Sequence, residues 1–206
     1  LHSYSRTADY KKCPRIVYHS RYRNWEPMGW NVHFGFGSAW HAAREIVFAL
    51  INTHKREISN DEVVEKAMLA FDAAWVAKGM PIGEDLITQA DTLKAKTPTN
   101  ARATLAEYVP LRRELIERVR LIGSEVPFSA RLGEAPDGTI LFYRGFIDNI
   151  VEDEDGTITF YEAKTTSMSS GDGLAYNYVQ AFNPNSQIEG YSWEGYRVFG
   201  DRFAGV

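Results

Sequence analysis

The stretch GFIDNIVEDEDGTITFYEAKTT, residues 145–166, decides the fold of this chain. On both sides of Glu154-Asp155-Gly156, apolar and polar residues alternate, which is typical of half-buried strands joined by a tight turn. The stretch therefore predicts a β-hairpin. Near its end, Glu162 and Lys164 lie two residues apart and so point to the same face, although earlier members of that face are apolar. Charged groups on a face that leads into a core need a partner or a function.

The length of the turn sets which residues face each other across the hairpin. With a three-residue loop, whose third position favours glycine, Asp153 pairs with Thr157. The same register places Asp148 opposite Glu162, on the face that also holds Lys164. A two-residue loop would shift the register by one residue and separate these three side chains.

The cluster of Asp148, Glu162 and Lys164 suggests metal-ion chemistry. Two facing carboxylates repel each other unless a cation lies between them, and hard oxygen ligands suit Mg²⁺ or Mn²⁺. Beside such an ion, a lysine can position water or stabilise the charge of a phosphorane. The alternative is a salt-bridged strand end without chemistry, and the three residues alone leave both interpretations open.

The composition is that of a folded globular domain. Of the 206 residues, 44% are hydrophobic and 24% are charged, and no apolar run is long enough for a transmembrane helix. The single cysteine, Cys13, excludes an internal disulfide and suits a reducing compartment. We therefore expect a cytoplasmic protein, or a viral protein acting in the host cytoplasm, without a membrane partner.

Charge is distributed unevenly along the chain. The formal net charge of −4 gives no general reason to expect a polyanionic partner. Residues 1–30, however, carry six Lys or Arg against two Asp or Glu, a net charge of +4. Within this segment, Lys11, Lys12 and Arg15 form either a solvated helix face or a set of contacts with backbone phosphates.

Hydrophobic periodicity divides the chain into a helical part and a strand-rich part. Apolar residues at helical spacing predict four helices, over residues 38–53, 59–78, 101–122 and 187–198. Alternating residues predict three strands, over residues 126–132, 141–151 and 157–163. We expect Pro110 to kink or break the third helix, and the polar residues 165–173 to form a loop.

These elements indicate an α/β (α+β) fold, a mixed β-sheet flanked by helices. We expect one domain over residues 1–206, with a helical insertion at about 54–122 that covers or guides a substrate. A short basic helix capped by Ser3 or Ser5 is expected to end before Pro14. The chain starts without methionine and ends in a strand-like RFAGV, so we expect a C-terminally incomplete fragment.

Four motifs, in order, resemble those of a known enzyme family. Gly145 and Asp148, followed after a turn by Glu162-x-Lys164, resemble motifs II and III of the PD-(D/E)XK nuclease superfamily. Upstream, FGFGSAWHAAREI resembles the Gly-x-x-x-His motif of its RecB-like exonuclease branch. Downstream, QIEGY resembles that branch's Gln-x-x-x-Tyr motif, and the opening SYSRTADYKKCPRIVY resembles its N-terminal signature. The resemblance extends to the CRISPR-associated RecB-like exonucleases and spans nearly the whole chain.

The resemblance implies a restriction-endonuclease-like fold and a role for each motif residue. Asp148, Glu162 and Lys164 are the implied catalytic residues. The implied ligands of one or two Mg²⁺ or Mn²⁺ ions are His41, Asp148, Glu162 and the backbone carbonyl of Ala163. Gln187 and Tyr191 are implied to contact DNA, and beside such a site we expect Lys11, Lys12 and Arg15 to meet its backbone.

Taken without the resemblance, several of these residues have ordinary structural interpretations. His41 on an apolar helix would be a hydrogen-bonded core histidine. Gln187 and Tyr191, one helical turn apart, would make packing and solvent contacts. Glu45, close to His41, and Glu125, just before a predicted strand, are weaker site candidates, and for Glu125 we expect a structural role.

Cys13 stands where some RecB-like members place one of four cysteines that hold an iron–sulphur cluster. The other three lie near the C-terminus in those members, and this chain has no second cysteine. No iron–sulphur cluster is therefore expected within this chain, and Cys13 is expected to be a small buried residue.

The function that we expect is that of a metal-dependent DNA nuclease. It would be an exonuclease hydrolysing phosphodiester bonds of ssDNA or DNA ends, with DNA as its partner. The resemblance adds protein partners in a recombination, repair or CRISPR-type complex. Two other classes stay open: a non-catalytic nucleic-acid-binding or assembly module with this fold, and a metal-dependent phosphohydrolase of small nucleotides.

Overall fold

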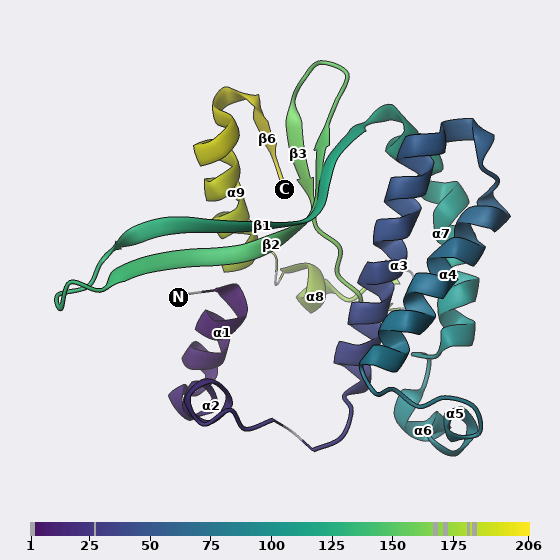
Figure 1. Cartoon of the computed structure of the whole chain (residues 1–206), viewed down its shortest axis with the longest axis horizontal. Coiled ribbons are helices and arrows are strands. Elements are labelled where there is room, and N and C mark those ends of the chain that lie inside the picture. The colour runs from purple at the N-terminus through teal and green to yellow at the C-terminus, as the bar shows by residue number, and fades with distance from the viewer. Residues whose placement is uncertain (1–2, 27, 167–168, 171–172, 181, 183–184) are drawn as a thin grey trace.

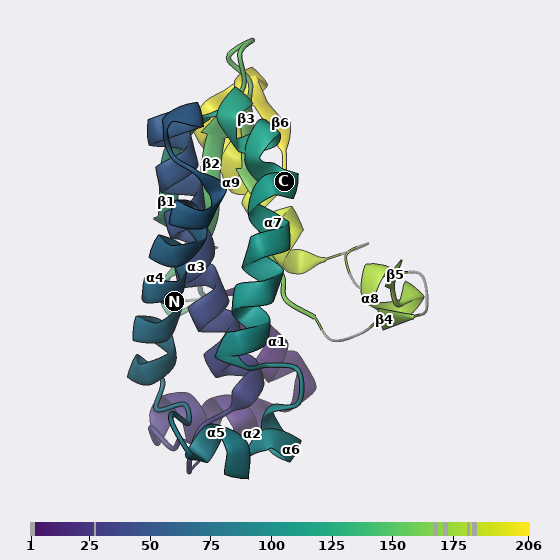
Figure 2. The same ribbon diagram turned by 90° about the vertical axis from the view of Figure 1, so that its right-hand side faces the viewer.

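Three long helices form one end of the molecule (Figure 1). They are α3 (Val32–His54), α4 (Asn60–Ala77) and α7 (Pro98–Arg118), and Figure 2 shows them side by side. The short helices α5 (Asp85–Thr88) and α6 (Ala90–Leu93) connect α4 to α7. The structure, a computed structural model, describes residues 3–26, 28–166, 169–170, 173–180, 182 and 185–206.

Each long helix begins at a polar capping residue. The side chains of Asn31, Ser59 and Thr97 accept a hydrogen bond from the backbone N–H three residues further on. These bonds satisfy amides that have no partner within the helix, so local sequence sets all three starts. The cap at Asn31 places the start of α3 six residues before the predicted position, while the predicted start of the second helix is confirmed.

The third helix ends earlier than predicted, at Arg118, and Pro110 lies within it. Residues 120–122 belong to a strand because the side chain of Asn52 holds the junction. Its amide nitrogen donates to the carbonyls of Ile116 and Val119, at 3.0 and 2.6 Å, and its oxygen accepts from the Leu121 N–H at 3.0 Å. A single amide side chain therefore changes the chain from helix to strand.

A four-stranded mixed sheet, ordered β1-β2-β3-β6, forms the middle of the molecule. Its strands are β1 (Arg120–Glu134), β2 (Ile140–Glu152), β3 (Ile158–Tyr161) and β6 (Phe203–Gly205). β6 is parallel to β3, and the other neighbouring pairs are antiparallel. Helix α9 (Ser186–Phe199) packs on β3 and β6. The predicted mixed sheet flanked by helices is confirmed, as are the three predicted strands.

The hairpin between β2 and β3 has the predicted three-residue loop. The Asp153 N–H donates to the Thr157 carbonyl at 2.9 Å, and Ile150 pairs with Phe160. β3 ends at Tyr161, two residues before the predicted end at Ala163. The Ala163 N–H donates instead to the Asp148 carboxylate, so a side chain replaces the backbone partner that would have continued the strand.

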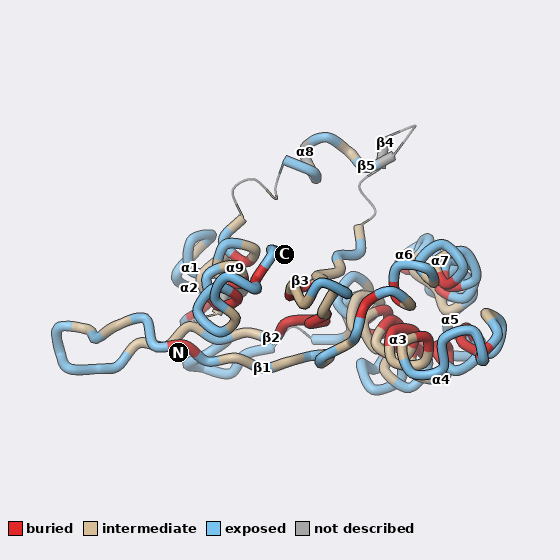
Figure 3. The backbone as a smooth tube through the Cα atoms, turned by 90° about the horizontal axis from the view of Figure 1, so that it is seen from above, coloured by how far each residue is buried: buried red, intermediate tan, exposed pale blue. Residues whose placement is uncertain are grey.

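Two apolar cores lie on either side of this hairpin. The larger core is formed between α3, α4 and α7, and the smaller one between the sheet and α9. Figure 3 shows buried residues along the three helices and in the C-terminal half of β2, whereas the far end of the β1–β2 hairpin is exposed. Residues 54–122 supply α4 and α7, and their status as an insertion stays a prediction.

The N-terminal segment forms three short helices next to one another. They are α1 (Tyr4–Lys12), α2 (Pro14–Val17) and the π-helix η1 (Tyr18–Tyr22). Pro14 is the first residue of α2, so the basic helix ends before it as predicted, and Cys13 between them is half-buried. α1 contacts α9.

The segment after the β2–β3 hairpin extends away from the sheet (Figure 3). It contains β4 (Ser169–Ser170), β5 (Gly173–Leu174) and α8 (Tyr176–Gln180). Residues 167–168 and 171–172 of the predicted loop lie outside the described residues. Across the described part of the chain, no helix has the length and apolar character needed to cross a membrane.

Candidate active site

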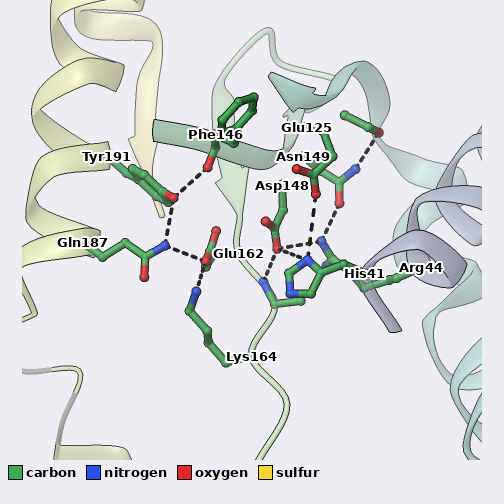
Figure 4. A network of polar contacts seen from close by, with 12 residues as sticks. His41, Arg44, Glu125, Phe146, Asp148, Asn149, Glu162, Lys164, Gln187 and Tyr191 are labelled. Carbon is green, nitrogen blue, oxygen red and sulfur yellow. Dashed lines mark hydrogen bonds and ion pairs between the residues drawn. The ribbon is translucent and has the colours of Figure 1, made fainter. Parts of the chain in front are cut away.

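Side chains from both halves of the molecule meet at one open groove of about 550 Å³. α3 contributes His41, β1 contributes Glu125 and β2 contributes Asp148. Glu162 and Lys164 come from the segment that follows β3 (Figure 4). The groove also includes Gly37, Glu45, Gln187 and Tyr191.

Asp148 is held by donors from three directions. Its Oδ2 atom accepts the Ala163 N–H at 2.8 Å and an Arg44 guanidinium N–H at 3.2 Å, and it lies 3.3 Å from His41 Nδ1. The residue is 8% exposed, so these contacts replace most of its hydration. The carboxylate is therefore fixed in orientation before any ligand binds.

Arg44 and Asn149 form a polar layer behind Asp148. The Arg44 guanidinium donates to Asn149 Oδ1 at 2.8 Å, and Asn149 donates to Ser124 Oγ at 2.8 Å. Both residues are buried, and neither was among the predicted site residues. Arg44 lies three residues after His41, on the same helix face, which is the one sequence signal that could have identified it.

Glu125 lies in the site, contrary to the structural role expected for it. Its neighbours in the ladder, Ser124 paired with Asn149 and Val126 paired with Ile147, place it opposite Asp148. Its backbone φ of 48° is in the left-handed region, which costs a non-glycine residue about 1 kcal/mol. One ligand atom from each of His41, Glu125 and Asp148 lies within 4.8 Å of the others.

Glu162 lies at the other side of the groove with one oxygen paired. Its Oε1 atom accepts hydrogen bonds from Lys164 and from Gln187 Nε2, the latter at 2.9 Å. Its Oε2 atom is buried and has no hydrogen-bond partner among the described residues. A buried carboxylate oxygen without a donor is a position suited to a cation.

Burial is the main cause of the pKa shifts in the groove, and the charge of Asp148 adds to the shifts of two carboxyl groups. Burial raises the pKa of Glu162, and the nearby Asp148 carboxylate raises it further. Burial and Asp148 likewise raise the pKa of Glu125. Burial lowers the pKa of His41 and outweighs the opposing effect of Asp148, which favours the neutral imidazole that binds metals.

Gln187 and Tyr191 face inward from α9 and support Glu162. Gln187 Nε2 donates to the Tyr191 hydroxyl at 2.8 Å as well as to Glu162, and that hydroxyl donates to the Phe146 carbonyl at 2.6 Å. Burial raises the pKa of Tyr191, which stays a neutral donor. The pair thus connects the smaller core to the carboxylate.

The other predicted residues are placed differently. The backbone of Ala163 lies close enough to the His41 imidazole to raise its pKa slightly, so Ala163 lies beside the groove. Lys11 and Lys12 are exposed in α1 and Arg15 in α2, and none of the three lines the groove. The structure thus brings the hairpin and helix residues together but not these cations.

The donor set fits a divalent cation. A neutral imidazole, three carboxylates and a backbone carbonyl are the ligand types that Mn²⁺ and Mg²⁺ accept in proteins. Four carboxylates line the groove against one lysine, Lys164, and the Arg44 guanidinium lies behind Asp148. The four are Glu45, Glu125, Asp148 and Glu162. The unpaired Oε2 of Glu162 adds a second, independent indication.

Comparison with known families matches almost the entire chain. The model of the PD-(D/E)XK nuclease superfamily matches residues 2–193, a range that includes all of the groove residues named above. Among curated proteins, no sequence matches this chain. The family assignment therefore rests on the match over residues 2–193 and on the geometry of the groove.

Proposed function

The chain belongs to the PD-(D/E)XK nuclease superfamily, and from that premise we propose that it is a metal-dependent deoxyribonuclease of the RecB-like exonuclease branch. Members of the superfamily are generally metal-dependent nucleases, so a nucleic-acid substrate follows from membership. The single observation that carries the proposal is the convergence of Asp148, Glu162 and Lys164 on one open groove.

We assign the metal ligands to the two sides of this groove. His41, Glu125 and Asp148 would hold one ion, and Glu162 with the Ala163 carbonyl would complete its shell or hold a second ion. Mg²⁺ or Mn²⁺ bound there supplies Lewis-acid polarisation of the phosphate and lowers the pKa of the attacking water. Arg44 keeps Asp148 oriented without entering the groove.

We assign to Lys164 the roles of positioning the attacking water and stabilising the charge of the phosphorane. Its ammonium is paired with Glu162, and the side chain is 37% exposed, so it can turn toward a substrate in the groove. Water attacks phosphorus in line, the bond to the leaving oxygen breaks, and the lysine stabilises the charge that develops on the phosphoryl oxygens. Gln187 and Tyr191 keep Glu162 in place beside the scissile phosphate.

We propose ssDNA or DNA ends as the substrate. The acidic net charge disfavours an extended duplex interface, which is much more positively charged in other proteins. A short single strand needs only a local groove with cations and aromatic rings. Residues 54–122 would cover or guide that strand.

The test is degradation of labelled linear and circular DNA, single- and double-stranded, with Mg²⁺, with Mn²⁺ and with EDTA. We expect cutting of linear substrates with either metal and none in EDTA. Glu162→Gln should abolish cutting, because the neutral amide keeps the shape but loses the charge that binds the ion. Glu114→Gln makes the same change on the exposed surface of α7 and should cut normally.

Each result separates one part of the proposal. Efficient cutting of circles would replace the exonuclease assignment by endonuclease action. Normal cutting by Glu162→Gln would overturn the assignment of the active site. A folded protein that cuts no DNA with either metal would overturn the assignment of nuclease activity.

A further inference from the structure

The N-terminal segment contains an unusual concentration of positive charge. Residues 10–25 contain five Lys or Arg and no Asp or Glu. The net charge of residues 31–206 is −8, since the whole chain carries −4 and residues 1–30 carry +4. An anionic ligand would therefore be attracted to this segment and repelled by most of the remaining surface.

Aromatic rings alternate with the cations in the second half of this segment. We call Tyr18, Arg21, Tyr22, Arg23 and Trp25 the aromatic–basic surface. Its aromatic members are largely exposed: Tyr18 is 49% exposed, Tyr22 70% and Trp25 59%. Exposed aromatic groups in a cluster mark an interaction site more often than a solvated face.

A π-helical turn arranges these rings. In η1 the Arg23 N–H donates to the Tyr18 carbonyl at 3.1 Å, five residues back. Tyr18 and Tyr22 then stack with ring centroids 6.4 Å apart and an interplanar angle of 26°. Turns of this kind are rare and are frequently found at functional sites.

Trp25 continues the stacked arrangement after the turn. Its ring stacks on His19 with centroids 4.6 Å apart at 20°, and the Arg23 guanidinium lies 6.0 Å from the same ring. The Trp25 N–H donates to the His19 carbonyl at 2.9 Å. The indole is therefore held in a fixed orientation although most of its surface is exposed.

In Figure 1, α2, which η1 follows directly, and the beginning of α3 lie on the same side of the β1–β2 hairpin. There Phe34, 66% exposed, lines the groove, and the Lys78 ammonium lies 4.9 Å from its ring centroid. One turn later, a Cβ atom added to Gly37 would meet only Thr165 Oγ1, at 3.7 Å. The groove thus offers the same chemistry at Phe34, an exposed ring with a cation beside it.

We infer that the aromatic–basic surface binds single-stranded nucleic acid and leads it past Phe34 into the groove. Unpaired bases stack on exposed rings in a sequence-tolerant way, while arginines meet the phosphates. A duplex hides its base faces and could not use the rings. The inference rests on the proposed function, since it names the form of the strand that this groove would cut.

Binding is measured by fluorescence anisotropy in EDTA, so that no cutting occurs, with a labelled oligothymidylate of about 20 nucleotides and a blunt duplex of equal length. Tyr22→Ala/Trp25→Ala should weaken single-strand binding about tenfold or more, the effect of removing one base stack, and leave duplex binding nearly unchanged. Trp25→Phe keeps a ring and should retain most of the affinity.

A second variant tests the phosphate contacts. Arg21→Ala/Arg23→Ala should reduce the slope of log affinity against log salt by about 0.7 for each phosphate that the protein no longer neutralises. Tyr196→Ala is the matched control, since this tyrosine of α9 is 60% exposed but lies in another part of the chain. Its affinity should equal that of the unmodified chain, and circular dichroism should show that every variant is folded.

The outcomes separate this inference from the proposed function. Metal-dependent cutting with single-strand affinity that neither double variant changes would overturn the inference alone and assign the surface to a protein partner. Single-strand binding that both variants weaken, in a protein that cuts nothing, would overturn the nuclease and keep the inference. Equally weakened binding of duplex and single strand would also overturn it, because rings that stack on bases cannot act on paired ones.

Discussion

The bundle of α3, α4 and α7 and the sheet differ in what they bury. The bundle core is apolar, and Val47, Phe71 and Leu105 in it are fully buried. The sheet buries Asp148 and Asn149 on the strand that faces α3. One region thus holds most of the hydrophobic stabilisation and the other positions the charges.

The candidate active site lies where the helical bundle meets the sheet. The helical bundle contributes His41 and Arg44 from a single turn of α3. The sheet contributes Glu125 and Asp148, and Glu162 follows β3. This separation means that stability and activity should respond to different substitutions, except at Arg44, which contacts both regions. Four measurements test that difference, and the three substitutions are given from the largest expected effect to the smallest.

Lys164→Ala should have the largest effect, and on activity alone. We expect cleavage to fall on the order of 10³-fold, about 4 kcal/mol of barrier, because the developing phosphorane loses a donor. The unfolding free energy should change little, since Lys164 is partly exposed. Rates and urea midpoints measured on the same preparation test both statements.

The control for this variant is Lys66→Ala. Lys66 pairs with Glu62 on the exposed surface of α4, as Lys164 pairs with Glu162 in the groove. Cleavage by Lys66→Ala should be unchanged. A fully active Lys164→Ala would contradict the assignment of the lysine.

Leu105→Ala should show the opposite behaviour. Removing a fully buried leucine from α7 leaves a cavity and should lower the unfolding free energy by about 3 kcal/mol. The specific activity of the folded protein should stay within a factor of about two, since α7 contributes nothing to the groove. Leu111→Ala, on the same helix but 76% exposed, should change neither quantity. A large fall in the activity of folded Leu105→Ala would show that the regions are coupled.

The hairpin could be predicted from the sequence because its determinants are local. Alternation over residues 157–161 and the glycine of a three-residue loop fix the register, and this register brings Asp148 to the segment that carries Glu162 and Lys164. The caps at Ser59 and Thr97 are equally local. Local rules therefore recovered the strands, most of the helices and the carboxylate–lysine cluster.

Glu125 could be named only as a weak candidate, because a β-bulge decides the face of β1 on which it lies. Ala135 bonds to Thr139 across the β1–β2 turn, and an unbroken ladder from there would place Val126 opposite Asp148. The register shifts by one residue between Arg131 and Gly133, so Glu125 takes that position instead. A single-residue irregularity some distance along the strand decides which side chain enters the site.

Arg44 was missed for a different reason. The helix that contains Arg44 was predicted correctly. However, the partners of Arg44, Asp148 and Asn149, lie more than 100 residues away in sequence. Only the packing of α3 against β2 brings them together, and no local pattern encodes that packing.

Arg44→Met should lower stability where the helical bundle meets the sheet. In EDTA we expect the unfolding free energy to fall by about 2 kcal/mol, because Asp148 loses a charged donor but keeps the Ala163 N–H. With saturating Mn²⁺ the decrease should be smaller, since an ion supplies the missing positive charge. Arg44→Lys keeps the charge and serves as the control. Equal decreases with and without Mn²⁺ would show that Arg44 acts by packing and not by charge.

The last measurement is the pH dependence of metal binding. The pKa values of Glu125 and Glu162 are raised above the usual 4.5, mainly by burial, so protons compete with the ion above that pH. Without metal, these groups stabilise the fold fully below pH 4.5, and their contribution is lost as pH rises through the raised values. Mn²⁺ affinity should therefore increase with pH, at most about tenfold per unit for each carboxylate, and then level off.

This pH dependence also distinguishes the two sides of the groove. The lowered pKa of His41 favours the neutral imidazole, so His41 should contribute less to the slope than a histidine whose pKa is not lowered. Glu125→Gln should remove one of the protons that compete with Mn²⁺, so the Mn²⁺ affinity should depend less steeply on pH. Calorimetric titration of Mn²⁺ between about pH 5 and 8 measures this dependence. A curve that Glu125→Gln leaves unchanged would mean that the ion is held by Asp148 and Glu162. In that case β1 would shape the groove without binding the metal. The metal-binding carboxylates would come only from β2 and from the segment that follows β3.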